Sequence, residues 1–253
     1  MVRGYNMGKI PYIIMTPDYR HNSAGIRVLH LLCTMLNKQG YEAYITAEKS
    51  TKGNKSIELN SDKLKQLILD GSIVVYPDKY QKNILHSWNP VGWELNTVEF
   101  AFEREGLIFT YDLKYGNHEL FTIIDTEEFF NNDKKYERKG NLVYVGKGTI
   151  DARVNEIPEL TIINSTEPDT RKKLAELLKR SKMLYTYDSR TMITTEAILC
   201  GCPVTLLENG RNTLEDFSKN SIPSPDNNEA QLINFIKKTQ EWALQRNEER
   251  KHL

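Results

Sequence analysis

The chain has 253 residues, enough for one large domain or two small ones. Hydrophobic residues make up 39% and charged residues 27%, as in a globular protein that buries a core. The 34 Lys and Arg residues balance the 34 Asp and Glu residues, so no basic excess exists to neutralise a nucleic-acid backbone. No apolar run approaches the roughly 18 residues of a membrane-spanning helix, and the N-terminus lacks the apolar stretch of a secretory signal. We therefore expect a cytoplasmic protein without a net-basic nucleic-acid surface.

The first half of the chain alternates strand and helix patterns. Residues 11–15 form an apolar run typical of a buried strand, apolar residues then recur at helical spacing up to Gly40, and residues 41–45 alternate like a second strand. This unit has the size of a βαβ crossover. After it we expect a polar loop at residues 47–60 and a helix at 63–69. Three further strands are expected at 72–76, 107–111 and 120–124. Residues 78–106 show no clear pattern.

A charged, turn-rich segment at residues 131–135 separates the two halves. We place the domains at residues 1–135 and 136–253. Beyond the break the alternation restarts. Strands are expected at 142–145, 160–163, 183–187 and 204–207, and helices at 171–181, 194–200 and 228–246. The last of these helices could also pack back on the N-terminal domain. Alternation in both halves predicts an α/β fold with two Rossmann-like domains.

Residues 187–204 carry the most chemical information. An apolar strand runs into a turn dense in hydroxyl groups, a helix begins, and Gly-Cys-Pro at 201–203 turns the chain back into the next strand. In an open parallel sheet such a turn lies at the carboxyl edge, where ligands bind. A helix N-terminus there presents free N–H groups and a partial positive charge, which suit a diphosphate. Asp188 and Glu196 flank this predicted anion site and suit sugar hydroxyls.

This segment resembles the nucleotide-sugar motif of retaining GT-B glycosyltransferases of the family 4 type. That motif has an acid, seven residues, Glu, Ala and then Gly-x-Pro-Val, matched here by Asp188, Glu196, Ala197 and residues 201–204. The resemblance implies two domains facing across a cleft, with the donor on the C-terminal one and the acceptor on the N-terminal one. It further implies that Glu196 binds the ribose hydroxyls. Asp188 would contact the transferred sugar, although the family usually has Glu there.

Further donor residues follow from the resemblance, which covers residues 141–207. Gly146 and Lys147 follow a strand, where the family places glycines and a basic residue near the diphosphate, and Arg190 is a second candidate cation. The predicted catalytic residues are Asp188, Glu196, Lys147 and Arg190. The predicted donor-binding residues are Gly146, Lys147, Ser189, Arg190, Thr194, Thr195, Glu196 and Gly25. Taken singly, Glu196 could also be a simple helix acid, and the two threonines could be caps.

The acceptor side is predicted from looser matches. Arg20, His21, Gly25 and Arg27 lie in or after the loop that follows the first strand, and Asp112 and His118 follow the strand at 107–111. A loop histidine such as His21 is more often an ordinary surface residue. Two tryptophans in the unassigned stretch, Trp88 and Trp93, suit either stacking on an acceptor sugar or burial in the core.

The cysteine pattern and the acidic pattern both argue against a metal. Cys33, Cys200 and Cys202 are odd in number and lie in apolar segments, which favours reduced core thiols over disulfides. The Cys-x-Cys pair has no second ligand pair at zinc-site spacing. No Asp-x-Asp, the usual metal–diphosphate clamp of other glycosyltransferases, occurs in the sequence. We expect neither a metal nor another cofactor.

The sequence therefore predicts transfer of a sugar from a nucleoside-diphosphate donor to a hydroxyl acceptor, with retained configuration implied by the resemblance. Two alternatives remain open, a non-catalytic sugar-nucleotide or glycan-binding module and a nucleotide-sugar 2-epimerase. The base, the sugar and the oligomeric state are not readable from the sequence. The acceptor could be a glycan, a lipid-linked glycan, a protein or a modified nucleic acid.

Overall fold

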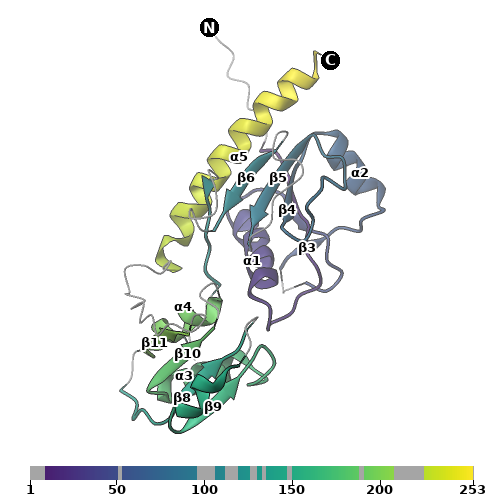
Figure 1. Ribbon diagram of the computed structural model, residues 1–253. Coiled ribbons are helices and arrows are strands. Elements are labelled where there is room, and N and C mark those ends of the chain that lie inside the picture. Colours follow the sequence, from purple (N-terminus) through teal and green to yellow (C-terminus); the bar gives the residue numbers. More distant parts are fainter. Residues whose placement is uncertain are drawn as a thin grey trace. The chain divides into compact units, whose positions relative to one another are not determined.

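The chain forms two compact units (Figure 1). The computed structural model describes residues 9–50, 53–95, 106–111, 119–125, 130–132, 135–146, 150–187, 191–207 and 225–252. Unit 1 consists of residues 1–20, 25–124 and 225–253, and unit 2 of residues 21–24 and 125–224. The sequence placed a boundary at 135/136. In the structure the main change of unit falls at 124/125, and the C-terminal helix belongs to unit 1.

Unit 1 contains a parallel sheet whose described strands run in the order β3-β2-β1-β4-β5-β6-β7. These strands are β1 (Tyr12–Ile14), β2 (Ala43–Ile45), β3 (Lys55–Ser56), β4 (Ile73–Pro77), β5 (Asn89–Glu94), β6 (Leu107–Thr110) and β7 (Glu119–Leu120). The helices are α1 (Ala24–Lys38), α2 (Asp62–Leu69) and α5 (Asn228–Arg250), the last preceded by the 3-10 turn η4 (Pro225–Asn227). The order reverses between β1 and β4, as in a Rossmann fold.

Local chemistry sets the ends of the helices in unit 1. α1 buries its apolar stripe, including Leu29 and Leu32, and the chain leaves it through Gly40 at φ 77°. Glycine adopts this left-handed conformation without the steric penalty of a Cβ atom. α2 begins after Ser61, whose side-chain oxygen accepts a hydrogen bond from the Leu64 N–H. This cap satisfies one of the free amides of the first turn.

Helices α2 and α5 cover opposite faces of the unit 1 sheet. Successive strand residues point to opposite faces, and Ile13 packs in the same buried cluster as Leu64 of α2. Its neighbour Tyr12 instead contacts Phe235 of α5, with ring centroids 6.2 Å apart. Phe109 lies 4.8 Å from the same ring of Phe235. The aromatic side of the sheet therefore forms the core that α5 closes, and Figure 1 shows α5 passing beside β6.

The C-terminal part of α5 is fastened to the loop before β5. Trp88 Nε1 donates to the Arg246 carbonyl at 2.9 Å, and Arg246 Nε donates to the Trp88 carbonyl at 3.1 Å. The Arg246 guanidinium also lies 5.2 Å from the ring centroid of Trp88 and 5.1 Å from that of Trp242. Trp93 is 1% exposed and donates to the Phe121 carbonyl. Trp93 is thus a core residue, and Trp88 serves the docking of α5.

Unit 2 contains a second parallel sheet, with its described strands in the order β11-β10-β8-β9. The strands are β8 (Asn141–Tyr144), β9 (Leu160–Ile163), β10 (Met183–Thr186) and β11 (Val204–Leu206). The 3-10 helix η2 (Ala152–Glu156) follows β8, α3 (Arg171–Arg180) precedes β10, and α4 (Met192–Leu199) follows β10. The core lies between the sheet and the two α-helices, with Leu142, Leu178, Leu184 and Ala197 fully or almost fully buried. The predicted α/β class with two Rossmann-like units is confirmed.

The three cysteines are buried and free, as the sequence predicted. Burial raises the thiol pKa of Cys33 and Cys200 to about 12 and that of Cys202 to about 11, because a thiolate is poorly solvated in an apolar interior. These thiols are therefore packing groups rather than nucleophiles. None of the described helices combines the length and the hydropathy needed to cross a bilayer.

Candidate functional site

The strand order of unit 2 defines a switch point between β8 and β10. These two strands are paired from Asn141↔Met183 to Tyr144↔Thr186, and the chain leaves β8 toward β9 on one side and β10 toward β11 on the other. In open parallel sheets ligands bind in the crevice outside the carboxyl ends of two such strands. The segments that follow β8 and β10 are the two in which the sequence predicted the donor site.

The structure describes the flanks of both segments. After β8 the chain reaches Gly146, which is exposed and has φ 56°. Lys147 comes next and lies outside the described residues, as do Asp188, Ser189 and Arg190 after β10. Asp112 and His118 of the predicted acceptor side lie outside them as well. The described flanks nevertheless show how the two segments begin and end.

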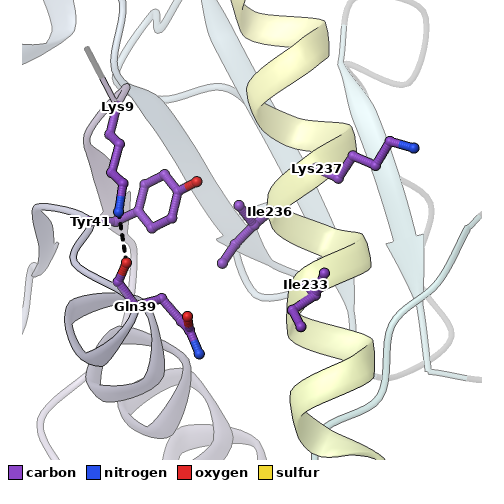
Figure 2. A pocket seen from close by; sticks show the side chains of 6 residues that line it. All are labelled: Lys9, Gln39, Tyr41, Ile233, Ile236 and Lys237. Atoms are coloured by element: carbon purple, nitrogen blue, oxygen red, sulfur yellow. Dashed lines mark hydrogen bonds between the residues drawn. The ribbon is translucent and has the colours of Figure 1, made fainter.

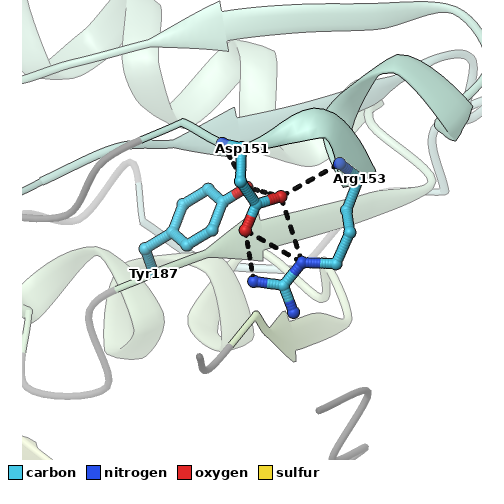
Figure 3. A network of polar contacts seen from close by, with 3 residues as sticks. All are labelled: Asp151, Arg153 and Tyr187. Atoms are coloured by element: carbon cyan, nitrogen blue, oxygen red, sulfur yellow. Dashed lines mark hydrogen bonds and ion pairs between the residues drawn. The ribbon is translucent and has the colours of Figure 1, made fainter. Parts of the chain in front are cut away.

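A polar network joins the far end of the first segment to the near end of the second (Figure 3). Tyr187 is the first residue after β10, and its hydroxyl donates to Asp151 Oδ1 at 3.1 Å. Arg153 Nε donates to both carboxylate oxygens of Asp151 at 3.0 Å, and its guanidinium carbon lies 5.7 Å from the Tyr187 ring centroid. The hydrogen bonds from Arg153 hold the pKa of the Asp151 carboxyl at about 2. The network therefore ties together the chain segments on both sides of the switch point.

The N-terminus of α4 lies at the same edge but starts earlier than expected. The sequence predicted its first residue near Thr194, whereas the helix begins at Met192 after the extended Thr191. The Thr194 N–H donates to the Thr191 carbonyl at 3.2 Å, and its hydroxyl donates to the same carbonyl at 2.8 Å. The Thr194 amide is therefore engaged inside the helix. The first-turn amides that lack an intrahelical acceptor are those of Met192 and Ile193, directly before the predicted Thr194 and Thr195.

Glu196 occupies a buried ion pair. Its Oε1 lies 2.6 Å from Nη1 of Arg171, and the two side chains are 4% and 8% exposed. Arg171 Nη2 also donates to the Asp125 carbonyl at 3.3 Å, and its guanidinium lies 4.8 Å from the Phe130 ring centroid. The sequence identified Glu196 but missed Arg171, which is 25 residues away. As the first residue of α3, Arg171 faces an unfavourable helix dipole, which the Glu196 carboxylate offsets.

The predicted residues in and after the loop that follows β1 differ in exposure and contacts. Arg20 and His21 are exposed, and His21 Nε2 lies 3.2 Å from the Asp169 carbonyl. Arg27 is 5% exposed within α1. At Gly25 an added Cβ atom would meet Leu95 Cδ1 at an ordinary 3.7 Å. Packing within unit 1 therefore does not require a glycine at that position.

One described hollow, with a volume of about 360 Å³, lies elsewhere in unit 1 (Figure 2). It is lined by Lys9, Gln39, Tyr41, Ile233, Ile236 and Lys237. Lys9 precedes β1 and Gln39 follows α1, which places the hollow at the amino edge of the sheet. The Lys9 ammonium already donates to the Gln39 carbonyl at 2.8 Å and lies 4.4 Å from the Tyr41 ring centroid. The hollow contains none of the predicted site residues.

Among the described residues, no group of three or more His, Cys, Asp or Glu side chains gathers in a metal-binding arrangement. The chemistry that the described residues of the edge offer is therefore that of amides at a helix N-terminus, a glycine turn and a carboxylate held by an arginine. Such groups suit a ligand with an anionic part and neighbouring hydroxyls.

No protein-family profile matches the chain, and no curated protein matches its sequence. Among solved structures it is similar to MurG of Acinetobacter baumannii, with 10% identity over 94% of this chain and 95% of that chain and a TM-score of 0.43. The glycosyltransferase SnogD from Streptomyces nogalater matches with 10% identity, 96% and 95% coverage and a TM-score of 0.43. An alpha-glucosyltransferase in complex with UDP and a mismatched 13-mer DNA matches with 12% identity, 92% and 91% coverage and a TM-score of 0.42. Likenesses of this size identify neither the substrates nor the site residues of this chain.

Proposed function

We propose that this chain is a glycosyltransferase of the GT-B type, which moves a sugar from a nucleoside-diphosphate donor to a hydroxyl acceptor. The observation that carries the proposal is the place of the acid-x7-Glu segment in unit 2. Its first acid, Asp188, comes two residues after β10, and its Glu196 lies in α4. β10 borders the switch point of a parallel sheet. A motif of this kind at a strand–turn–helix junction has the structural context that its chemistry needs.

The donor diphosphate is assigned to the N-terminus of α4. The amides of Met192 and Ile193 and the positive end of the helix dipole favour an anion there. Lys147 and Arg190 supply two cations from the segments after β8 and β10. Together these groups stabilise the charge that develops on the departing nucleoside diphosphate, without requiring a metal. Retention of configuration and contact of Asp188 with the transferred sugar complete the proposal on the strength of the motif.

Glu196 is assigned to the ribose hydroxyls, with Arg171 as its positioning residue. A carboxylate alone in a buried site would be costly, and the Arg171 guanidinium 2.6 Å away offsets that cost. Because Arg171 is fixed by the Asp125 carbonyl, the carboxylate is held in one orientation. In this assignment a ribose hydroxyl donates to a carboxylate that Arg171 already orients.

Substitution of Glu196 tests the assignment. Glu196→Gln keeps the shape of the side chain but removes the charged acceptor, so we expect weaker binding of a sugar nucleotide by about 10- to 100-fold, the value of a charged hydrogen bond of about 1.5–3 kcal/mol. Isothermal titration of UDP-, GDP- and ADP-sugars, followed by transfer assays with the donor that binds, measures the loss. Equal binding and turnover in the wild type and in Glu196→Gln would remove Glu196 from the donor site.

A matched double variant separates binding from stability. Glu196→Gln leaves Arg171 buried without its full partner, which by itself destabilises a protein. Replacing both residues, as in Arg171→Met with Glu196→Met, removes the pair without leaving a lone buried charge. We expect this variant to keep a thermal midpoint near that of the wild type and still to lose donor binding. If it binds donor as the wild type does, the pair is purely structural.

Incubation with the donor alone distinguishes the remaining alternatives. A transferase gives at most slow hydrolysis without an acceptor, whereas a 2-epimerase would convert the sugar, and a binding module would leave it intact under every acceptor. A proton NMR time course of the donor with and without an acceptor panel follows all three outcomes.

A further inference from the structure

In the described part of unit 1, one buried carboxylate oxygen has no hydrogen-bond partner. Glu94 is the last residue of β5 and is 6% exposed, and its Oε2 is buried without a hydrogen bond. No described residue forms an ion pair with it. Burying an ionised carboxylate without compensation is strongly unfavourable, and most buried polar atoms in native proteins are hydrogen-bonded. A group that breaks this rule in the resting protein is a candidate for a ligand contact.

The register of the sheet shows which face carries Glu94. Trp93 lies opposite Phe109, and Glu94 lies opposite Thr110, so Glu94 is on the other face from these two aromatic rings. Ile108 shares that other face and packs in the cluster that includes Leu64 of α2. Glu94 is therefore on the α2 face of the sheet, outside the aromatic core that α5 closes.

The position of Glu94 along its strand is the second observation. β5 ends at Glu94 and pairs with β4, one of the two strands at the switch point of unit 1. Glu94 therefore belongs to the carboxyl edge, where open parallel sheets bind ligands. The same face of β5 has a glycine, Gly92, two residues earlier, so β5 itself places no side chain there beside Glu94.

The chemistry of the site selects the ligand. A carboxylate repels phosphates and other anions, and the described residues offer no second and third acidic ligand for a metal ion. Thr110, directly opposite on β6, is fully buried and uncharged. A buried carboxylate oxygen opposite an uncharged threonine suits a neutral hydrogen-bond donor such as a sugar hydroxyl.

We propose that Glu94 accepts a hydrogen bond from a hydroxyl of a polyol ligand that binds at the carboxyl edge of the unit 1 sheet. In the proposed reaction this ligand is the hydroxyl acceptor, and that identification rests on the proposed function, whereas the binding site itself does not. If the proposal holds, Glu94 lowers the stability of the ligand-free protein and raises its affinity for the ligand. Substitution of Glu94 should therefore raise the stability and lower the affinity.

The experiment compares Glu94→Gln with the wild-type protein and with Glu58→Gln, which changes an exposed glutamate of the same unit. Without ligand, Glu94→Gln should raise the thermal midpoint by about 2–5 °C, because a neutral amide costs less to bury than a carboxylate without a hydrogen-bond partner, and Glu58→Gln should not change it. Saturation-transfer NMR with methyl glycosides of glucose, galactose, mannose and N-acetylglucosamine should show at least one binder. Its affinity should fall about tenfold or more in Glu94→Gln only.

Several results would overturn the proposal. A lower midpoint of Glu94→Gln would show that the carboxylate has a structural partner, and unchanged glycoside binding would remove it from the site. Absence of glycoside binding by the wild-type protein would also overturn it. If ethanolamine binds in a Glu94-dependent way and no glycoside binds, the group that Glu94 recognises is an ammonium and not a hydroxyl. Nucleotide titration of the same variants keeps the two proposals separate. If nucleotide binding fails while Glu94-dependent glycoside binding persists, the proposed function is wrong and the Glu94 site remains.

Discussion

Asp151 is the residue whose contacts near the switch point have the clearest consequence for pH dependence. Hydrogen bonds from Arg153 lower its pKa from 3.8 to about 2 in the folded protein. A folded pKa below the unfolded one adds stability that is fully present above about pH 4 and is lost as the pH falls toward 2. We therefore expect the difference in unfolding midpoint between wild type and Asp151→Asn to shrink over this interval. An Asp151 carboxyl that titrates near pH 4 in a carbon-detected NMR experiment would contradict the network of Figure 3.

The residues of the candidate site differ in how far the sequence could predict them. Glu196 and Gly146 belong to local motifs, whose other residues are close to them in the sequence and can be recognised there. Arg171 lies 25 residues from its partner and is the first residue of a polar helix, a position that indicates nothing about burial. Glu94 ends a strand that has no alternating pattern. Long-range pairing and burial decide the roles of these last two residues, and neither property is visible in a single sequence.

At the scale of elements, the apolar periodicity predicted most helices and strands, and it failed where burial is unusual. β5 was missed because Asn89, Pro90 and Gly92 are all poor strand formers. The structure accommodates Pro90 because β6 begins only opposite Val91, so its missing N–H costs no hydrogen bond on that side. The polar edge strand β3 is exposed at Lys55 and Ser56 and carries no apolar signal.

The docking of α5 gives a prediction for a whole element. Arg246→Ala removes a hydrogen bond to the Trp88 carbonyl and the contacts of the guanidinium with Trp88 and Trp242. We expect the free energy of unfolding to fall by about 1–3 kcal/mol, from cation–π contacts of about 0.5–1 kcal/mol each and one hydrogen bond. Lys237→Ala is the control, since it removes an exposed charge from the same helix. Equal urea midpoints for the two variants would show that Arg246 does not hold the helix.

At the scale of the whole molecule, the two units have separate cores and differ in their number of tryptophans. All three tryptophans, Trp88, Trp93 and Trp242, belong to unit 1, whereas the proposed donor site lies in unit 2. Tryptophan fluorescence should therefore follow the unfolding of unit 1, and calorimetry the unfolding of both units. A chain with two cores is not expected to unfold in one two-state step.

A bound nucleoside diphosphate should then stabilise one unit selectively. At a hundred times its dissociation constant a ligand adds about 2.7 kcal/mol to the state that binds it, which for a small domain raises the midpoint by about 10 °C or more. We expect UDP, GDP or ADP to move one calorimetric transition by this amount while the fluorescence midpoint stays in place. Glu196→Gln should reduce the shift of the calorimetric midpoint that the bound nucleoside diphosphate produces, because its acceptor for the ribose hydroxyls is altered.

If the nucleotide raises the fluorescence midpoint and the calorimetric midpoint together, either the two units unfold as one body or the nucleotide binds unit 1. The same titration on Glu94→Gln decides between these cases, because a nucleotide site in unit 1 near Glu94 would respond to that substitution and a site in unit 2 would not.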